Sequence, residues 1–359
     1  MSQAVKITIL ATVGVMLVIV LQMVALDTNA SLYLSVGEEA PVNRAYIQDR
    51  LGETYEKPEL GHDGRFFFVQ AQDPFILDPD VYDEVIDRPL YRSQRLLYPL
   101  LASPARVVSQ WTMVWWMLGI NVIAMAAGTY FTARVAERMG LSAWLGLAFT
   151  LNPGVWAELN AGSAGTLAWA LAVGGILMYL EGRLPLAVGL LVGAVLAREA
   201  MLLVVAGVAL HSWRTHERIP PALAAPVLTA IAWGLYVRVR MGADLWASES
   251  EEFGLPLAGF IGAVGDWLDD ADAVRMLVGL VFVVLLFRFV ALARRVPHVV
   301  GWAVLGFAAM APFFSSQVWF NPYDISRAVL PVVTAFVLLA ALDIQQSASV
   351  KGVPPEASG

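Results

Sequence analysis

One short stretch, GHDGRFFF at residues 61–68, combines a single carboxylate with two glycines and three consecutive phenylalanines. Gly61 and Gly64 permit a close approach of backbones or an unusual dihedral angle on either side of Asp63. Aromatic residues favour the interface between membrane and water, so the phenylalanines would hold the carboxylate at the level of lipid headgroups. A lipid-linked substrate presents its polar head at that level. A solvated carboxylate in an interfacial helix explains the pattern equally well.

Two arginines follow in the segment LYRSQRLLYPLLA, three residues apart. This spacing would place Arg92 and Arg95 on one face of a helix, with the leucines of the same segment directed toward the membrane. Two guanidinium groups at an interface suit a phosphate, because each can hold its oxygens in a bidentate manner. The alternative is that they anchor an interfacial helix to lipid headgroups.

Charged residues also interrupt or border apolar stretches further along the chain. Arg198 and Glu199 lie in the middle of the apolar run at 184–211, where charges are costly and tend to mark function. They could instead form a structural ion pair that pins a broken helix. Asp324 and Arg327 are three residues apart at the expected start of the last helix, where a carboxylate also stabilises the helix N-terminus.

Two acidic motifs allow simpler interpretations as well. Glu158 lies near one end of an apolar run and could extend its carboxylate to water. The Asp78-Pro79-Asp80 triplet offers hard oxygen ligands for a divalent cation such as Mg²⁺ or Mn²⁺, but such a triplet is also typical of a turn. The chain has no cysteine, which excludes a disulfide framework, a thiol nucleophile and cysteine-type metal sites.

The elements that must position these residues are membrane helices. The 359-residue chain is 58% hydrophobic and only 15% charged, which is far more apolar than a soluble domain usually is. Its net charge of −7 resides in loops and gives no indication of nucleic-acid binding. We predict an all-α polytopic membrane protein with apolar runs at 5–26, 108–132, 141–160, 163–181, 184–211, 220–241, 273–293, 298–316 and 325–343.

The basic loops predict that both termini are cytoplasmic. The length of the first run favours an uncleaved signal anchor, and a signal peptide cleaved near Thr28-Asn29-Ala30 is the alternative. The run at 184–211 is too long for one crossing, so we expect a broken pair of helices that enters and returns, with Arg198 at or near the turn. Residues 1–344 then form one transmembrane domain with outer loops at about 27–107 and 242–272, and 345–359 form a disordered cytoplasmic tail. The charged residues described above would collect at the extracytoplasmic face, together with Asn160 and Asn321.

Several stretches together resemble bacterial members of the GT-C superfamily of membrane glycosyltransferases. They are HDG at 62–64 with its aromatic tail, DPF at 73–75, RPLYRSQRLLYPLLA at 88–102, LNPG at 151–154, LAREA at 196–200 and NPYDISRAVLPV at 321–332. The resemblance implies a helical bundle whose long first outer loop carries interfacial helices. It also implies transfer of a sugar from a polyprenyl-phosphate donor to a glycan, lipid or protein acceptor outside a bacterial inner membrane.

The same resemblance implies roles for individual residues. By position, Asp63 would be the catalytic base, with the Glu38-Glu39 pair as the second candidate. Cationic groups would stabilise the charge on the departing phosphate, supported by nearby acidic residues. These cations would be Arg92, Arg95, Arg198 and Arg327, and the supporting residues Glu158, Glu199 and Asp324. Some relatives use a divalent metal and others do not.

Two other classes of protein share these sequence features. A transporter or flippase of lipid-linked envelope precursors would also have many spans, a broken helix and buried charges. It would be expected to show inverted repeats and polar residues at the middle of the membrane, whereas here the polar residues are expected at one face. A non-enzymatic scaffold for the assembly of envelope polymers is the third interpretation.

Overall fold

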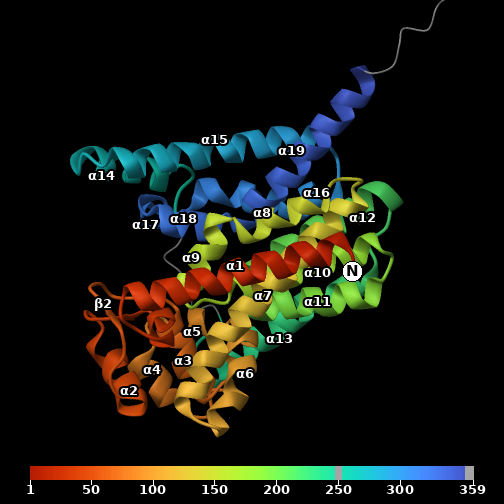
Figure 1. The fold of residues 1–359 in the computed structure, drawn as a ribbon. Coiled ribbons are helices and arrows are strands. Elements are labelled where there is room, and N and C mark those ends of the chain that lie inside the picture. Colours follow the sequence, from red (N-terminus) through yellow and green to blue (C-terminus); the bar gives the residue numbers. More distant parts are fainter. Residues whose placement is uncertain (246, 248–252, 352–359) are drawn as a thin grey trace, which may run out of the picture.

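The apolar runs of the sequence form helices in the structure, a computed structural model that describes residues 1–245, 247 and 253–351 (Figure 1). Among these residues, five helical segments are long and apolar enough to cross a membrane. They are Gln3–Ala25 (α1), Gln110–Arg138 (α7), Pro221–Arg240 (the turn η5, Pro221–Leu223, and α13, Ala224–Arg240), Ala273–Arg295 (α15) and Leu330–Ser349 in α19 (Leu330–Lys351). The prediction of an all-α membrane protein is confirmed at this level.

Residues 27–107 form a separate layer of short elements at one end of the bundle, drawn in red to orange in Figure 1. Proline occupies the first turn of several of these helices, where its missing N–H costs no hydrogen bond. A parallel pairing of two residues per strand joins β1 to β2. The elements are η1 (Ala30–Leu34), β1 (Val36–Gly37), α2 (Pro41–Leu51), β2 (Glu56–Lys57), α3 (Gly64–Gln72), α4 (Pro79–Val85), α5 (Pro89–Arg92), α6 (Leu97–Ala102) and η2 (Ser103–Val107).

The expected span at 141–160 is not one helix, which corrects the prediction. It consists of three short pieces, η3 (Ala143–Gly146), α8 (Leu147–Thr150) and α9 (Pro153–Asn160), followed by α10 (Gly165–Leu180). Pro153 explains the break, because a proline disfavours helical geometry in the residue before it. The side chain of Asn152 then caps the new helix by accepting a hydrogen bond from the Gly154 N–H at 2.9 Å.

The predicted broken pair at 184–211 is present as α11 (Leu184–Ala197), the turn η4 (Glu199–Met201) and α12 (Leu202–His216). Arg198, between the two helices, is extended. It contacts Glu158 beside the start of α10, whereas His211 near the end of α12 lies 3.5 Å from the Tyr179 hydroxyl at the end of α10. The chain therefore reverses its direction at Arg198, as expected.

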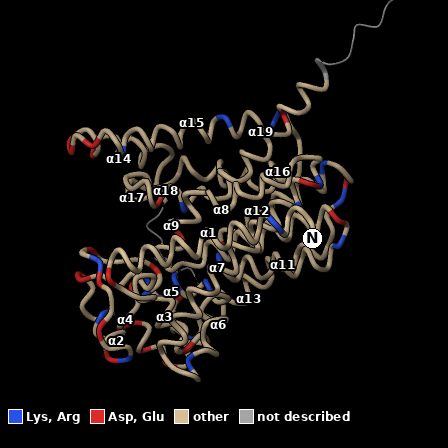
Figure 2. The backbone as a smooth tube through the Cα atoms, in the orientation of Figure 1, with Lys and Arg blue, Asp and Glu red and all other residues tan. Residues whose placement is uncertain are grey.

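The C-terminal part contains α14 (Ala258–Asp269), α15, α16 (Val299–Met310), η6 (Ala311–Phe313), α17 (Ser316–Phe320), α18 (Pro322–Ala328) and α19. The last helix continues past Gln345, where the sequence predicts a disordered tail, as far as Lys351. Residues 352–359 lie outside the described residues. Figure 2 shows that charged positions gather in the layer at 27–107 and near helix ends, and are sparse along the middle of the long helices.

Candidate active site

A tight backbone crossing fixes the position of Asp63. Gly61 has a φ of +77°, and a Cβ there would lie 2.1 Å from the carbonyl oxygen of Ser35. On the other side of Asp63, the Gly64 N–H donates to the carbonyl of Ala161 at 2.7 Å. A Cβ on Gly64 would lie 2.6 Å from the carbonyl oxygen of Tyr33. The two glycines therefore allow the chain to carry Asp63 close against η1 and the end of α9.

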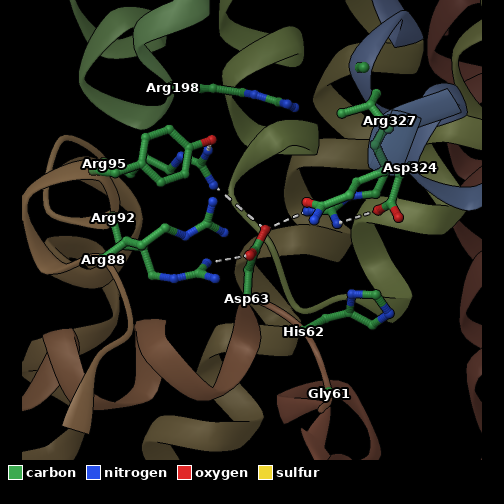
Figure 3. A pocket seen from close by; sticks show the side chains of 13 residues that line it. Gly61, His62, Asp63, Arg88, Arg92, Arg95, Arg198, Asp324 and Arg327 are labelled. Carbon is green, nitrogen blue, oxygen red and sulfur yellow. Dashed lines mark hydrogen bonds and ion pairs between the residues drawn. The ribbon is translucent and has the colours of Figure 1, made fainter. Parts of the chain in front are cut away.

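The carboxylate of Asp63 faces three arginines that come from two distant parts of the chain (Figure 3). Arg92 Nη1 donates to Oδ1 at 2.7 Å, Arg95 Nη1 lies 3.6 Å from Oδ2, and Arg327 Nη2 also donates to Oδ2. Burial alone would raise the pKa of Asp63, but Arg327, Arg92 and Arg95 hold this pKa well below its usual range. Asp63 is therefore ionised at neutral pH.

Glu158 forms the second anionic centre of the site. Its side chain is 0% exposed, so the expectation that it extends to water is wrong. Its Oε1 accepts from Arg198 at 3.0 Å and from Arg327 Nε at 3.1 Å, and its Oε2 accepts from the Gly165 N–H at 2.9 Å. Arg327 thus joins the two carboxylates, and its Nη1 also lies 3.5 Å from Asp324 in the expected i, i+3 pair.

Arg198 and Glu199 have different partners, contrary to the interpretation that they pair with each other. Arg198 binds Glu158, while Glu199 Oε2 lies 3.6 Å from Arg95 Nε. The turn between α11 and α12 is therefore attached both to α9 and to the segment that follows α5. The two ion pairs therefore hold the turn against two different elements.

These side chains surround a cavity of about 210 Å³. It brings together the predicted candidates Asp63, Arg92, Arg95, Arg198, Asp324 and Arg327, whereas Glu158 and Glu199 lie behind it as partners of the arginines. His62, Tyr91 and Gln317 also line it. Charged groups from α5 and the segment after it, from the turn between α11 and α12, and from α18 thus converge on one space, as the sequence predicts.

Arg88 is a lining residue that sequence reasoning missed. It has a φ of +49°, and its guanidinium lies 5.4 Å from the centre of the Tyr91 ring. Among the described residues it has no ion-pair partner, unlike the other arginines of the cavity. The available signal was its place in the same motif, four residues before Arg92.

Two local expectations for this region are wrong. Phe66, Phe67 and Phe68 are 3%, 3% and 0% exposed, so they form core and do not anchor the segment in a membrane interface. The ring of Phe66 instead lies 3.9 Å from the Arg92 guanidinium carbon. Arg92 and Arg95 do not share a continuous helix, because α5 ends at Arg92 and α6 begins at Leu97.

Polar groups next to the cavity are partly withdrawn from water. Burial, assisted by the charges of Arg327 and Lys57, lowers the pKa of His62 to about 4, and its ring lies 4.8 Å from that of Tyr323. Burial also lowers the pKa of Lys57 to about 8. Lys57 Nζ donates to the carbonyl of Asn160 at 3.1 Å, so Asn160 supports the site through its backbone. His62 is a neutral neighbour of the carboxylate at pH 7.

Several predicted residues lie elsewhere. Asp78 and Asp80 are exposed at the start of α4 and do not line the cavity, and Glu38 and Glu39 are exposed beside β1. Within the described part of the chain, no group of three or more His, Cys, Asp or Glu side chains is arranged to hold a metal ion. Asn321 caps α18 by accepting from the Tyr323 N–H at 3.0 Å. Asp78 and Asp80 therefore offer no ligand to the cavity.

No protein-family model, curated protein or solved structure matches this chain. The functional argument consequently depends on the geometry of the site. That geometry belongs to a helical membrane protein with a polar cavity in which the carboxylate of Asp63, ionised at neutral pH, is surrounded by arginines. Such a cavity can bind an anion through its guanidinium groups and can accept a proton on Asp63.

Proposed function

We propose that the protein is an integral-membrane glycosyltransferase that uses a polyprenyl-phosphate-linked sugar. The observation that carries the proposal is the convergence of Asp63 with Arg88, Arg92, Arg95 and Arg327 on one cavity. Arginine recognises phosphate through paired N–H donors, and a lipid phosphate is the anion that a membrane supplies. The resemblance to the GT-C superfamily supplies the reaction type, the bacterial inner membrane and the extracytoplasmic face.

In this proposal the donor phosphate lies against the arginines and the acceptor hydroxyl lies against Asp63. The acceptor oxygen attacks the anomeric carbon in line as the bond between that carbon and the phosphate oxygen breaks. The hydroxyl proton goes to Asp63, and the bonding electron pair leaves with the polyprenyl phosphate. The arginines stabilise the negative charge that develops on the departing phosphate, as preorganised cations do in other transfer reactions.

The ion pairs of Asp63 explain how a carboxylate with a depressed pKa can act as the base. Arg327, Arg92 and Arg95 currently lower its affinity for a proton. A donor phosphate would share the same guanidinium groups and so weaken their attraction to Asp63. The basicity of Asp63 then rises when the donor is bound, which couples proton abstraction to donor binding. Arg88, which has no carboxylate partner among the described residues, is available for the phosphate without breaking an ion pair.

The test measures transfer of radiolabelled sugar from a polyprenyl-phosphate donor in membranes that contain the protein. Asp63→Asn removes the proton acceptor and is expected to reduce turnover by at least about 100-fold, the usual contribution of a general base. Asp78→Asn is the matched control, because Asp78 is an exposed carboxylate outside the cavity and its loss should leave turnover unchanged. Expression and thermal unfolding are measured for both variants.

A second variant keeps the test decisive if Asp63→Asn folds poorly. Arg88→Gln removes no ion pair within the described residues, so it is expected to fold normally and to raise the KM for the donor about tenfold. An unchanged KM would contradict the assignment of the cavity to the donor phosphate. Movement of the labelled lipid across the bilayer without sugar transfer would instead identify a flippase.

A further inference from the structure

A second cavity lies between α15 and α19, away from the cavity around Asp63. Its volume is about 290 Å³. It is lined by Arg288, Leu292 and Arg295 of α15 and by Phe336, Ala340 and Asp343 of α19. The first turn of α15 is near α17, where Arg275 lies over the ring of Phe320. Arg288 is 13 residues after Arg275, or about 20 Å along α15 at 1.5 Å per residue. The second cavity is therefore far from the end of α15 that lies near α17.

Arg288 differs from the other arginine of this cavity in its partners. Arg295 forms an ion pair with Asp343 at 3.0 Å. Arg288 is exposed and has no ion-pair partner within the part of the chain that the structure describes. It precedes Arg295 by seven residues, which places it on the same face of α15 and about 10 Å further into the apolar span.

An unpaired guanidinium at this depth is costly unless it reaches an anion or water. Leu292, Phe336 and Ala340 provide an apolar wall on which acyl chains can lie. Lipid phosphates are the anions at the membrane surface beside Arg295, and the long side chain of Arg288 can extend toward them. Basic pockets between transmembrane helices recognise such phosphates. Two arginines against the single carboxylate of Asp343 leave a net positive charge, which favours an anionic headgroup over a zwitterionic one.

We propose that the cavity between α15 and α19 is a binding site for one anionic phospholipid of the surrounding bilayer. The phosphate lies between Arg288 and Arg295, and the acyl chains lie along the apolar side chains of α19. This site is independent of the proposed transferase reaction, because none of its residues lines the cavity around Asp63.

The test uses the full-length protein in detergent and counts lipids retained in native mass spectra after addition of phosphatidylglycerol or phosphatidylcholine. The expected result for the unaltered protein is one phosphatidylglycerol retained in preference to phosphatidylcholine. Arg288→Gln is expected to weaken this retention about five- to tenfold, the effect of one arginine near a lipid phosphate. Arg294→Gln is the matched control, because it removes a neighbouring charge of α15 that does not line the cavity.

Three outcomes would overturn the proposal. Equal effects of Arg288→Gln and Arg294→Gln would show general attraction of lipid to a basic helix end. Equal retention of the two phospholipids by the unaltered protein would show that charge does not select the lipid. Stronger retention of polyprenyl phosphate than of phosphatidylglycerol, lost in Arg288→Gln, would assign the cavity to a different occupant. Transferase activity is not the readout, so failure here leaves the proposed function untouched.

Discussion

The arginines at the two cavities satisfy their charge in different ways. Around Asp63, the guanidinium groups of Arg92, Arg198 and Arg327 lie inside the protein and bind carboxylates. Between α15 and α19, Arg288 is exposed and has no carboxylate among the described residues. In apolar surroundings an arginine needs an anion in either case. The first cavity supplies carboxylates to four of its arginines and leaves only Arg88 without one among the described residues. At the second cavity Asp343 pairs with Arg295, and in our proposal Arg288 takes its anion from the bilayer.

This difference has a consequence for exchange of ligands. A phosphate that reaches beyond Arg88 to the three arginines around Asp63 must compete with that carboxylate. That competition provides the link between donor binding and proton abstraction that the proposed reaction needs. A lipid phosphate at Arg288 displaces no protein carboxylate, so we expect this site to bind without a chemical consequence.

The largest effect is expected from loss of a buried carboxylate. Glu158→Gln leaves Arg198 and Arg327 without their shared counter-charge at a position that is 0% exposed. Removal of one partner from a buried ion pair costs about 3–5 kcal/mol, so we expect a markedly lower unfolding temperature. The measurement is thermal unfolding in detergent micelles, followed by tryptophan fluorescence.

The matched variant at the second cavity is Asp343→Asn. Its partner Arg295 is 67% exposed, and pairs of this kind contribute less than about 1 kcal/mol. A small change there, beside a large one for Glu158→Gln, is the expected result. Similar losses for the two variants would contradict the distinction between a carboxylate that organises the interior and one at the surface.

A smaller loss of stability, confined to the backbone contact beside Asp63, is expected from a substitution at Gly162. This residue has a φ of +62°, and a Cβ on it would lie 1.9 Å from the carbonyl oxygen of Tyr33. Gly162→Ala should cost about 3 kcal/mol, from left-handed backbone strain and from over-packing together. Because the backbone of Gly64 touches the same place, we also expect a loss of donor binding by the cavity.

Gly182 provides the comparison at the opposite end of α10. Its φ is +72°, but no atom lies within 4 Å of a Cβ built there. Gly182→Ala should therefore show only the backbone strain of about 1–2 kcal/mol and retain donor binding. Both variants are measured by thermal unfolding and by binding of a labelled polyprenyl phosphate. The difference between them gives the contribution of the close backbone contact beside Asp63.

Much of this arrangement could be predicted from sequence, because backbone strain and the burial of a charge each leave a mark at the residue concerned. Gly61 and Gly64 beside a lone carboxylate indicate a close backbone approach, and Arg198 inside an apolar run indicates a break with a partner. The convergence of distant charged residues followed from the order of the apolar runs. The break before Pro153 was missed, although the residue before a proline seldom remains helical.

Other features depend on contacts that a sequence does not display. Three consecutive aromatic residues have the same pattern whether they face lipid or fill a core. Here they belong to core clusters that also contain residues of the long helices. The pairing of Arg198 with Glu158, instead of the adjacent Glu199, likewise results from the position of α9. Sequence separation of 40 residues gives no indication of that contact.

An effect that depends on pH is expected from protonation beside the first cavity. The pKa of His62 is lowered to about 4 by burial and by the neighbouring cations Arg327 and Lys57, although Asp63 acts in the opposite direction. In the unfolded chain the ring has its ordinary pKa of about 6.5, so between these values the unfolded state binds more protons. Stability should therefore rise as pH increases from about 4 to about 6.5.

His62→Gln removes this contribution, so its unfolding temperature should depend less steeply on pH across that window than that of the unaltered protein. His216→Gln is the control, because His216 is exposed at the end of α12 and away from the cavity. Thermal unfolding at several pH values provides the measurement. Parallel curves for the unaltered protein and His62→Gln would mean that the ring beside Asp63 is solvated, and would place the cavity in water instead of in a partly enclosed site where ion pairs select a phosphate.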